Sequence, residues 1–345
     1  MEEIEFEKRF NQALSRLNKA ATIKDCFHYN KYECRLPIKN AHSLQKLGAL
    51  KILESEKNGN RYLYAHTERT NNLLQNFLDL KPIGKKAAST FFGFCDKHDT
   101  ELFSVLENDP NSTDILSDEH CFLHSYRSFA HSYHRKHEDY KLYHTKDSET
   151  LDLLIEMLGQ KKLEWLREGV ILSIRDLDKT KKKLNDLIEN KIYDGLEYFA
   201  IEYPYCAPVA CAALTSPFFC YSGKPINITI SKDEPLSDII TTVLPFSNRT
   251  VIILSAFKDE PVAIEYIDEI DNIKYDLQQQ KFLSFHLMNY AENCYISPKY
   301  YEKQNINWRK EYCNFLDISG DQSQPIMKFN TKFRFNYFDP LNSIS

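Results

Sequence analysis

Residues 84–103 read GKKAASTFFGFCDKHDTELF, and this stretch decides how the first third of the chain is organised. The apolar and aromatic run AASTFFGF predicts a β-strand, and the segment CDKHDTELFSVLE that follows predicts a helix. Cys95 and His98 stand at this predicted junction with two residues between them, a spacing at which both side chains can bind one ion. The stretch therefore predicts one half of a metal site.

The other half is expected upstream, in the polar segment 22–42 that contains Cys26 and Cys34. Structural zinc takes four thiolate or imidazole ligands in a tetrahedron, usually from two close pairs. Seven residues separate Cys26 from Cys34, which is wider than usual, and unpaired cysteines are often simply small buried apolar residues. The sequence favours a metal site over buried apolar cysteines, with one zinc ion held by Cys26, Cys34, Cys95 and His98.

His42 lies between the two pairs, and Asp99 directly follows the second. The order Cys…Cys…His…Cys-x2-His-Asp resembles the treble-clef form of HNH nucleases. This resemblance implies a ββα module in which His42 is the general base that activates water and Asp99 binds a catalytic magnesium or manganese ion. Ala41 stands where those nucleases usually have an Asp ligand. It favours a second hypothesis, an inert zinc module that binds nucleic acid or protein.

Two motifs also resemble those of a group of bacterial proteins that combine a Cys-Cys-AHS-Q segment with a GFCxxHDxxLF segment. Here the motifs comprise Cys26, Cys34, residues 41–45 and residues 84–103. The resemblance implies that these distant segments form one module. It also suggests a bacterial protein, in which an endonuclease on DNA or RNA would suit defence against viruses and other mobile elements. The acidic segment 1–7 lacks the basic region and apolar core of a signal peptide, so a cytoplasmic protein is expected.

Charge is unevenly distributed along the chain. Residues 1–100 carry 17 Lys and Arg against 12 Asp and Glu, whereas residues 101–345 carry 27 against 37. Contacts with nucleic acid are therefore expected in the first hundred residues, although a merely solvated basic surface is an alternative. The candidate phosphate contacts there are Arg35, Lys39, Lys85 and Lys86. No GxGxxG, GxxxxGK[ST] or GxSxG motif occurs, which argues against nucleotide-dependent enzymes and serine hydrolases.

A long helix is predicted from residue 118 to about 143, with a polar face opposite its aromatic one. The polar face comprises His120, His124, Arg127, His131 and His134. Three interpretations are open: a solvated face or a face docked on the zinc module, a phosphate-contacting face that includes Arg127, and a ribonuclease site. The last rests on Arg127-x6-His134, which resembles the R-x(4–6)-H motif of HEPN ribonucleases.

The whole pattern predicts an α+β protein in three parts: a zinc-binding module over 1–115, a helical extension over 116–192 and a mixed C-terminal domain over 193–345. Helices are expected over 4–20, over 148–192 with interruptions near Gly169 and Asp178, and over 262–296 before a loop-rich tail. Five short β-rich runs between 196 and 257 predict a mainly antiparallel sheet. The C-terminal domain is the expected surface for any protein partner, and no segment predicts a membrane span.

Overall fold

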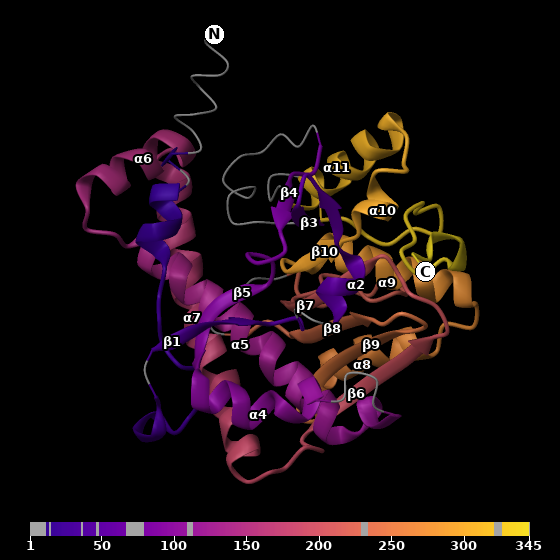
Figure 1. Cartoon of the computed structure of the whole chain (residues 1–345), viewed down its shortest axis with the longest axis horizontal. Helices are drawn as coiled ribbons and strands as arrows, with labels where there is room; N and C mark the ends of the chain where they lie inside the picture. The colour runs from indigo at the N-terminus through magenta and orange to yellow at the C-terminus, as the bar shows by residue number, and fades with distance from the viewer. Residues whose placement is uncertain are drawn as a thin grey trace.

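The computed structural model describes residues 12–13, 15–35, 37–45, 48–66, 79–108, 113–228, 234–320 and 326–344. Its strands form two sheets (Figure 1). The small one pairs β1 (Ile38–His42) with β5 (Thr90–Cys95) antiparallel, and α4 (Asp96–Asn108) follows β5 directly. The chain is α+β with a mainly antiparallel sheet, as predicted.

The larger sheet has the strand order β2-β3-β10-β7-β8-β9-β6, with β4 paired to β3. These strands are β2 (Ser55–Lys57), β3 (Asn60–Ala65), β4 (Pro82–Gly84), β6 (Leu196–Tyr203), β7 (Val209–Thr215), β8 (Ile239–Pro245), β9 (Thr250–Phe257) and β10 (Cys294–Ile296). Because β10 pairs with β7 on one side and β3 on the other, strands from both ends of the chain share one sheet. The sheet therefore contains strands from before residue 115 and from after residue 192, the two boundaries predicted between the three parts of the chain.

Helix α5 (Asp118–Tyr143) covers one face of this sheet, and α9 (Asp276–Tyr290) covers the other. The Ser128 hydroxyl of α5 lies 2.8 Å from that of Thr242, and His286 Nε2 of α9 lies 2.9 Å from the hydroxyl of Thr241. Neighbouring residues of a strand point to opposite faces, so the two helices sandwich β8. Helix α8 (Pro261–Asp271) packs against β6 and β9.

Two helix predictions need correction. The predicted helix over 148–192 is two helices, α6 (Ser148–Leu158) and α7 (Gln160–Glu189), and α7 runs unbroken through Gly169 and Asp178. The break is at Gly159, whose φ of 78° suits glycine. The predicted helix over 262–296 ends at Asp271, resumes at Asp276 and gives way to β10.

The tail expected to be rich in loops contains α10 (Pro298–Tyr301) and α11 (Ile306–Gly320). Residues 15–21 are helical, and most of the predicted helix over 4–20 lies outside the described residues. One of the five β-rich runs expected as strands is KPINITI, residues 224–230. It forms no strand over 224–228, and its last two residues lie outside the described part. Within the described ranges, no helix is both long and apolar enough to cross a bilayer.

Candidate metal centre

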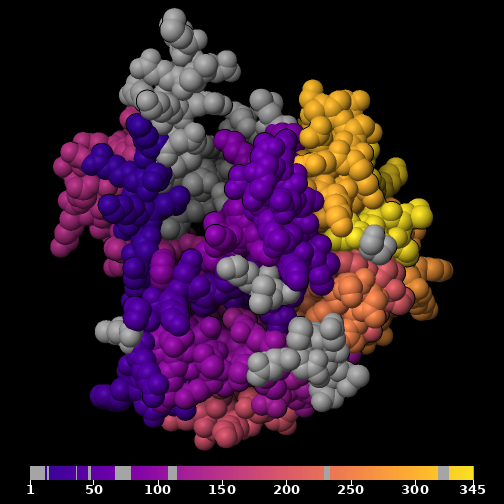
Figure 2. Space-filling view, viewed as in Figure 1, coloured from indigo at the N-terminus to yellow at the C-terminus, as the bar shows by residue number. Residues whose placement is uncertain are grey.

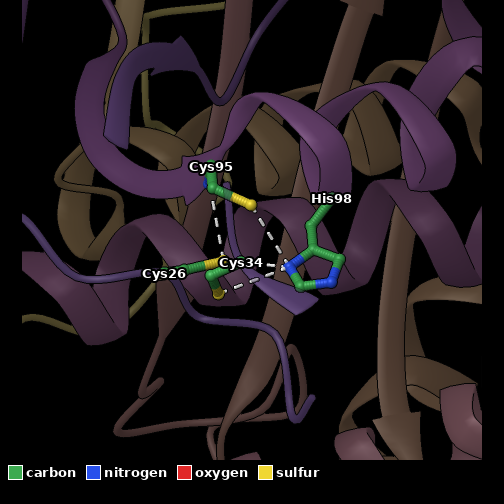
Figure 3. Close-up of side chains that lie close together, drawn as sticks. All are labelled: Cys26, Cys34, Cys95 and His98. Atoms are coloured by element: carbon green, nitrogen blue, oxygen red, sulfur yellow. Dashed lines mark hydrogen bonds between the residues drawn. The ribbon is translucent and has the colours of Figure 1, made fainter. Parts of the chain in front are cut away.

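Cys26, Cys34, Cys95 and His98 converge from three separate parts of the module (Figure 3). Their ligand atoms all lie within 4.8 Å of one another. The sulfur atoms of Cys26 and Cys95 are each 3.4 Å from Nδ1 of His98, and that of Cys34 is 3.7 Å away. The predicted ligand set is therefore brought together, and the cluster could hold a metal ion such as zinc.

The spacing and the chemistry of these four atoms fit zinc. Around a tetrahedral zinc, bonds of about 2.3 Å to sulfur and about 2.0 Å to nitrogen place sulfur and nitrogen about 3.5 Å apart. Burial raises the pKa of the Cys26 thiol to about 12, so this position does not hold a thiolate unaided. A divalent cation would supply the missing charge. Four protein ligands leave no open coordination position, which is typical of a structural site.

Backbone pairing places these ligands. Cys95 ends β5, and His98 lies in the first turn of α4. Two hydrogen bonds flank Cys26 and fix its segment beside β5: Asp25 N–H to the Phe92 carbonyl at 3.2 Å and Phe27 N–H to the Gly93 carbonyl at 2.6 Å. Cys34 follows a 3₁₀ turn, η1 (Lys31–Glu33), which shortens the path between the two cysteines.

His28 is a residue of this centre that the sequence interpretation missed. Its ring stacks on that of His98, with centroids 3.8 Å apart and planes 19° from parallel. Its Nδ1 accepts a hydrogen bond from Asn30 N–H, so in the neutral ring the proton is on Nε2. Burial, with the neighbouring His98, lowers the pKa of His28 to about 4 and keeps it neutral at pH 7. Its position two residues after Cys26 was the available signal.

His42 ends β1 opposite Thr90 of β5 and is partly exposed. Its Nδ1 lies 3.0 Å from the carbonyl oxygen of Ala88. A carbonyl can only accept, so Nδ1 donates and Nε2 of the neutral ring carries the lone pair. The neighbouring Ser43 is buried and bonds the hydroxyl of Ser89 at 3.1 Å, which ties the end of β1 to the start of β5.

Asp99 faces α5. Its Oδ1 is buried and lies 3.6 Å from Nη2 of Arg127, which also bonds Oε1 of Glu107 at 2.8 Å. Burial raises the pKa of Asp99 and outweighs the opposite effect of the Arg127 charge. The carboxylate expected to bind a catalytic metal ion thus has a buried guanidinium as its neighbour.

All five residues of the polar face of α5 are buried, so the interpretation as a solvated face is wrong. The alternative of docking on the zinc module is confirmed for three of the five: Arg127 contacts α4, the ring of His131 lies 5.2 Å from that of Phe91, and His134 Nε2 donates to the Ile23 carbonyl at 3.1 Å. Arg127 is only 3% exposed and does not offer a phosphate contact. Arg127 and His134 are both buried and contact different elements, which argues against a shared ribonuclease site.

The predicted basic residues divide into two groups. Lys85 is buried with its Nζ 2.5 Å from Oε2 of Glu54, and Lys39 forms an ion pair with Asp96. Lys85 is therefore not a surface phosphate contact, contrary to the prediction. Arg35 and Lys86 are exposed, as the prediction requires.

Comparisons with protein-family models, with curated proteins and with solved structures each gave no match. Its function is therefore inferred from the geometry of the chain.

Proposed function

We propose that the zinc module, residues 22–45 and 84–108 with the inserted strands β2–β4, is a zinc-stabilised unit that binds nucleic acid without cleaving it. The Asp99–Arg127 pair is the observation that supports binding without cleavage. Arg127 is held between Asp99 and Glu107, at 3.6 and 2.8 Å, so a positive charge already occupies the position next to the carboxylates. A second cation there would be repelled, and the four ligands of the zinc centre leave no position for a reacting water.

The surface we propose for nucleic acid is the β2–β3–β4 face, defined by Lys57, Tyr62, Lys81 and Lys86. All three lysines are exposed and have no ion pair within the described part of the chain. Tyr62 pairs in register with Ser55 on one side and Gly84 on the other, two small neighbours that leave its ring partly exposed. Residues 55–65 and 80–90 make up much of the prominent purple region in the centre of the molecule (Figure 2).

Lysines around an aromatic ring suit an unpaired nucleic-acid strand, because the charges contact phosphates and the ring can stack on a base. The hydroxyl of Tyr62 bonds Oε1 of Glu302 at 2.8 Å, which orients the ring. Binding of this kind depends strongly on salt and only weakly on sequence.

Replacing Lys57, Lys81 and Lys86 together with Ala should weaken binding of single-stranded DNA or RNA. Each lost phosphate contact should flatten the slope of log affinity against log salt by about 0.7. The measurement is fluorescence anisotropy with a labelled oligonucleotide between about 50 and 200 mM salt.

The matched control replaces Lys182, Lys183 and Lys224, which form ion pairs with Asp186, Asp259 and Glu265. It removes the same charge from other surfaces and should leave the affinity closer to that of the wild type. Equal loss in both triple variants would mean that only net charge matters, and the proposed face would be wrong.

His42 favours a second candidate, the metal-dependent endonuclease implied by the HNH resemblance. The bond from Nδ1 to the Ala88 carbonyl sets the tautomer that a general base needs, with the lone pair on Nε2. The antiparallel pairing of β1 with β5, which runs directly into α4, also supports this candidate, with α2 and β2–β4 inserted between the two strands.

We expect plasmid DNA and structured RNA to stay intact when incubated with the protein and Mg²⁺ or Mn²⁺. Cleavage that requires the divalent ion and disappears in His42→Ala would instead establish the endonuclease. Cleavage that survives His42→Ala would point to a contaminating nuclease or another site. Gel analysis of wild type and variant, prepared in parallel, separates these results.

A further inference from the structure

We propose that Cys34 is a site of oxidative modification: a peroxide oxidises it, a disulfide forms with Cys26, and the zinc is released. The first observation is a difference in exposure within the cluster. Cys26 and Cys95 are 1% and 0% exposed, whereas Cys34 is partly exposed at the end of η1. A small oxidant therefore reaches Cys34 before the other two sulfur atoms.

The second observation is the distance to a partner. All four ligand atoms lie within 4.8 Å of one another, so a sulfenic acid on Cys34 forms next to other sulfur ligands. Residues 29 and 31–33 between the two cysteines are exposed, whereas Cys95 is held in β5 by its pairing with Ile38. Cys26 and Cys34 lie in one short segment joined by this exposed turn, whereas Cys95 lies in a different segment. A Cys26–Cys34 disulfide therefore closes the shorter loop, which selects Cys26 as the partner of Cys34.

The chemistry balances without any further reagent. The Cys34 thiolate attacks one oxygen of hydrogen peroxide, the O–O bond breaks, and Cys34 sulfenic acid and hydroxide form. The Cys26 thiolate then attacks the sulfenic sulfur, the S–O bond breaks and a second hydroxide leaves. The two sulfur atoms lose two electrons in total, and the two peroxide oxygens gain them. Only Cys95 and His98 then remain as ligands, too few for a structural zinc site.

The other six cysteines do not compete with Cys34 for the oxidant, because each is buried. They are Cys121, Cys206, Cys211, Cys220, Cys294 and Cys313. Selective oxidation of Cys34 is thus a consequence of exposure, and it does not depend on nucleic-acid binding by the β2–β3–β4 face.

The test uses the purified full-length protein with hydrogen peroxide. Zinc release is followed with a chromogenic chelator, and thiols are mapped by mass spectrometry. We expect loss of one zinc per chain together with a Cys26–Cys34 disulfide, both reversed by a dithiol reductant and added zinc. A disulfide without Cys34, or release of zinc with all three thiols intact, overturns the proposal.

The decisive variant is Cys34→His, which keeps a zinc ligand but removes the exposed sulfur. Zinc release by peroxide should slow at least about tenfold, because the remaining thiolates are buried. Release at the wild-type rate contradicts the proposal. If the variant does not retain zinc, trapping sulfenic acid with dimedone in the wild-type protein decides: the first labelled residue must be Cys34, and any other residue refutes the assignment.

Discussion

Cys95→Ser should abolish zinc binding and lower the free energy of unfolding by about 4 kcal/mol or more, because loss of a structural metal is among the largest single-residue effects. Cys95 is the last residue of β5 and directly precedes α4. Without its sulfur, the zinc no longer ties the segment of Cys26 and Cys34 to the end of β5. The wild type should contain one zinc per chain. Elemental analysis gives the zinc content, and denaturant unfolding gives the stability.

The matched control is Cys121→Ser, which changes a buried cysteine of α5 outside the cluster. It should retain the zinc and lose much less stability, since it perturbs packing alone. A wild-type protein with less than about half an equivalent of zinc, together with equal destabilisation in both variants, would show that the cysteines are ordinary core residues.

The four metal ligands could be predicted because few residue types bind zinc and because Cys95 and His98 have a local spacing. The wide interval from Cys26 to Cys34 weakened the prediction of a shared metal site. The 3₁₀ turn at Lys31–Glu33 explains how the chain brings Cys34 back to Cys26. The order of β5 and α4 was equally readable, since an aromatic run followed by a helical pattern is a local signal.

The partners of buried charges could not be predicted, because they come from distant segments. Lys85 and Lys86 look alike in the sequence, yet one is buried against Glu54 and the other is exposed. Lys85 N–H donates to the carbonyl of Arg61 in β3, and this non-local pairing turns the Lys85 side chain inward. Gly159 and Gly169 illustrate the same limit: only the first has a positive φ, which no local pattern reveals.

The short strand β10 was missed for a related reason. Its three residues have no period of their own, and they form a strand because β3 and β7 bind both of their edges. The polar network beside β10 reaches the residue before β5: the hydroxyl of Tyr295 accepts from Ser89 N–H at 2.6 Å and donates to Asn293 at 2.9 Å. Such contacts pack the small β1–β5 sheet against the larger sheet.

Arg127→Met should destabilise the protein by about 3–5 kcal/mol, because it leaves the buried Oδ1 of Asp99 without a compensating charge. The wild-type and variant proteins can be compared by denaturant unfolding at pH 7. The additional change Asp99→Asn removes that buried charge, so the double variant should be more stable than Arg127→Met alone. A single variant that loses less than about 1 kcal/mol would show that the Asp99–Arg127 pair is not a determinant of stability.

The pH dependence distinguishes a lost charge pair from lost packing. Burial raises the pKa of Asp99, and without the Arg127 guanidinium it should rise further. Ionising a carboxyl whose pKa is raised by folding destabilises the folded state. This cost appears as the pH rises above the ordinary pKa of the carboxyl, and it vanishes below that pKa, where the carboxyl is protonated in both the folded and the unfolded state. The deficit of Arg127→Met relative to wild type should therefore shrink as the pH is lowered from 7 toward about 4. In the double variant with Asp99→Asn this recovery should be absent, whereas a packing defect would give the same deficit at every pH in both variants.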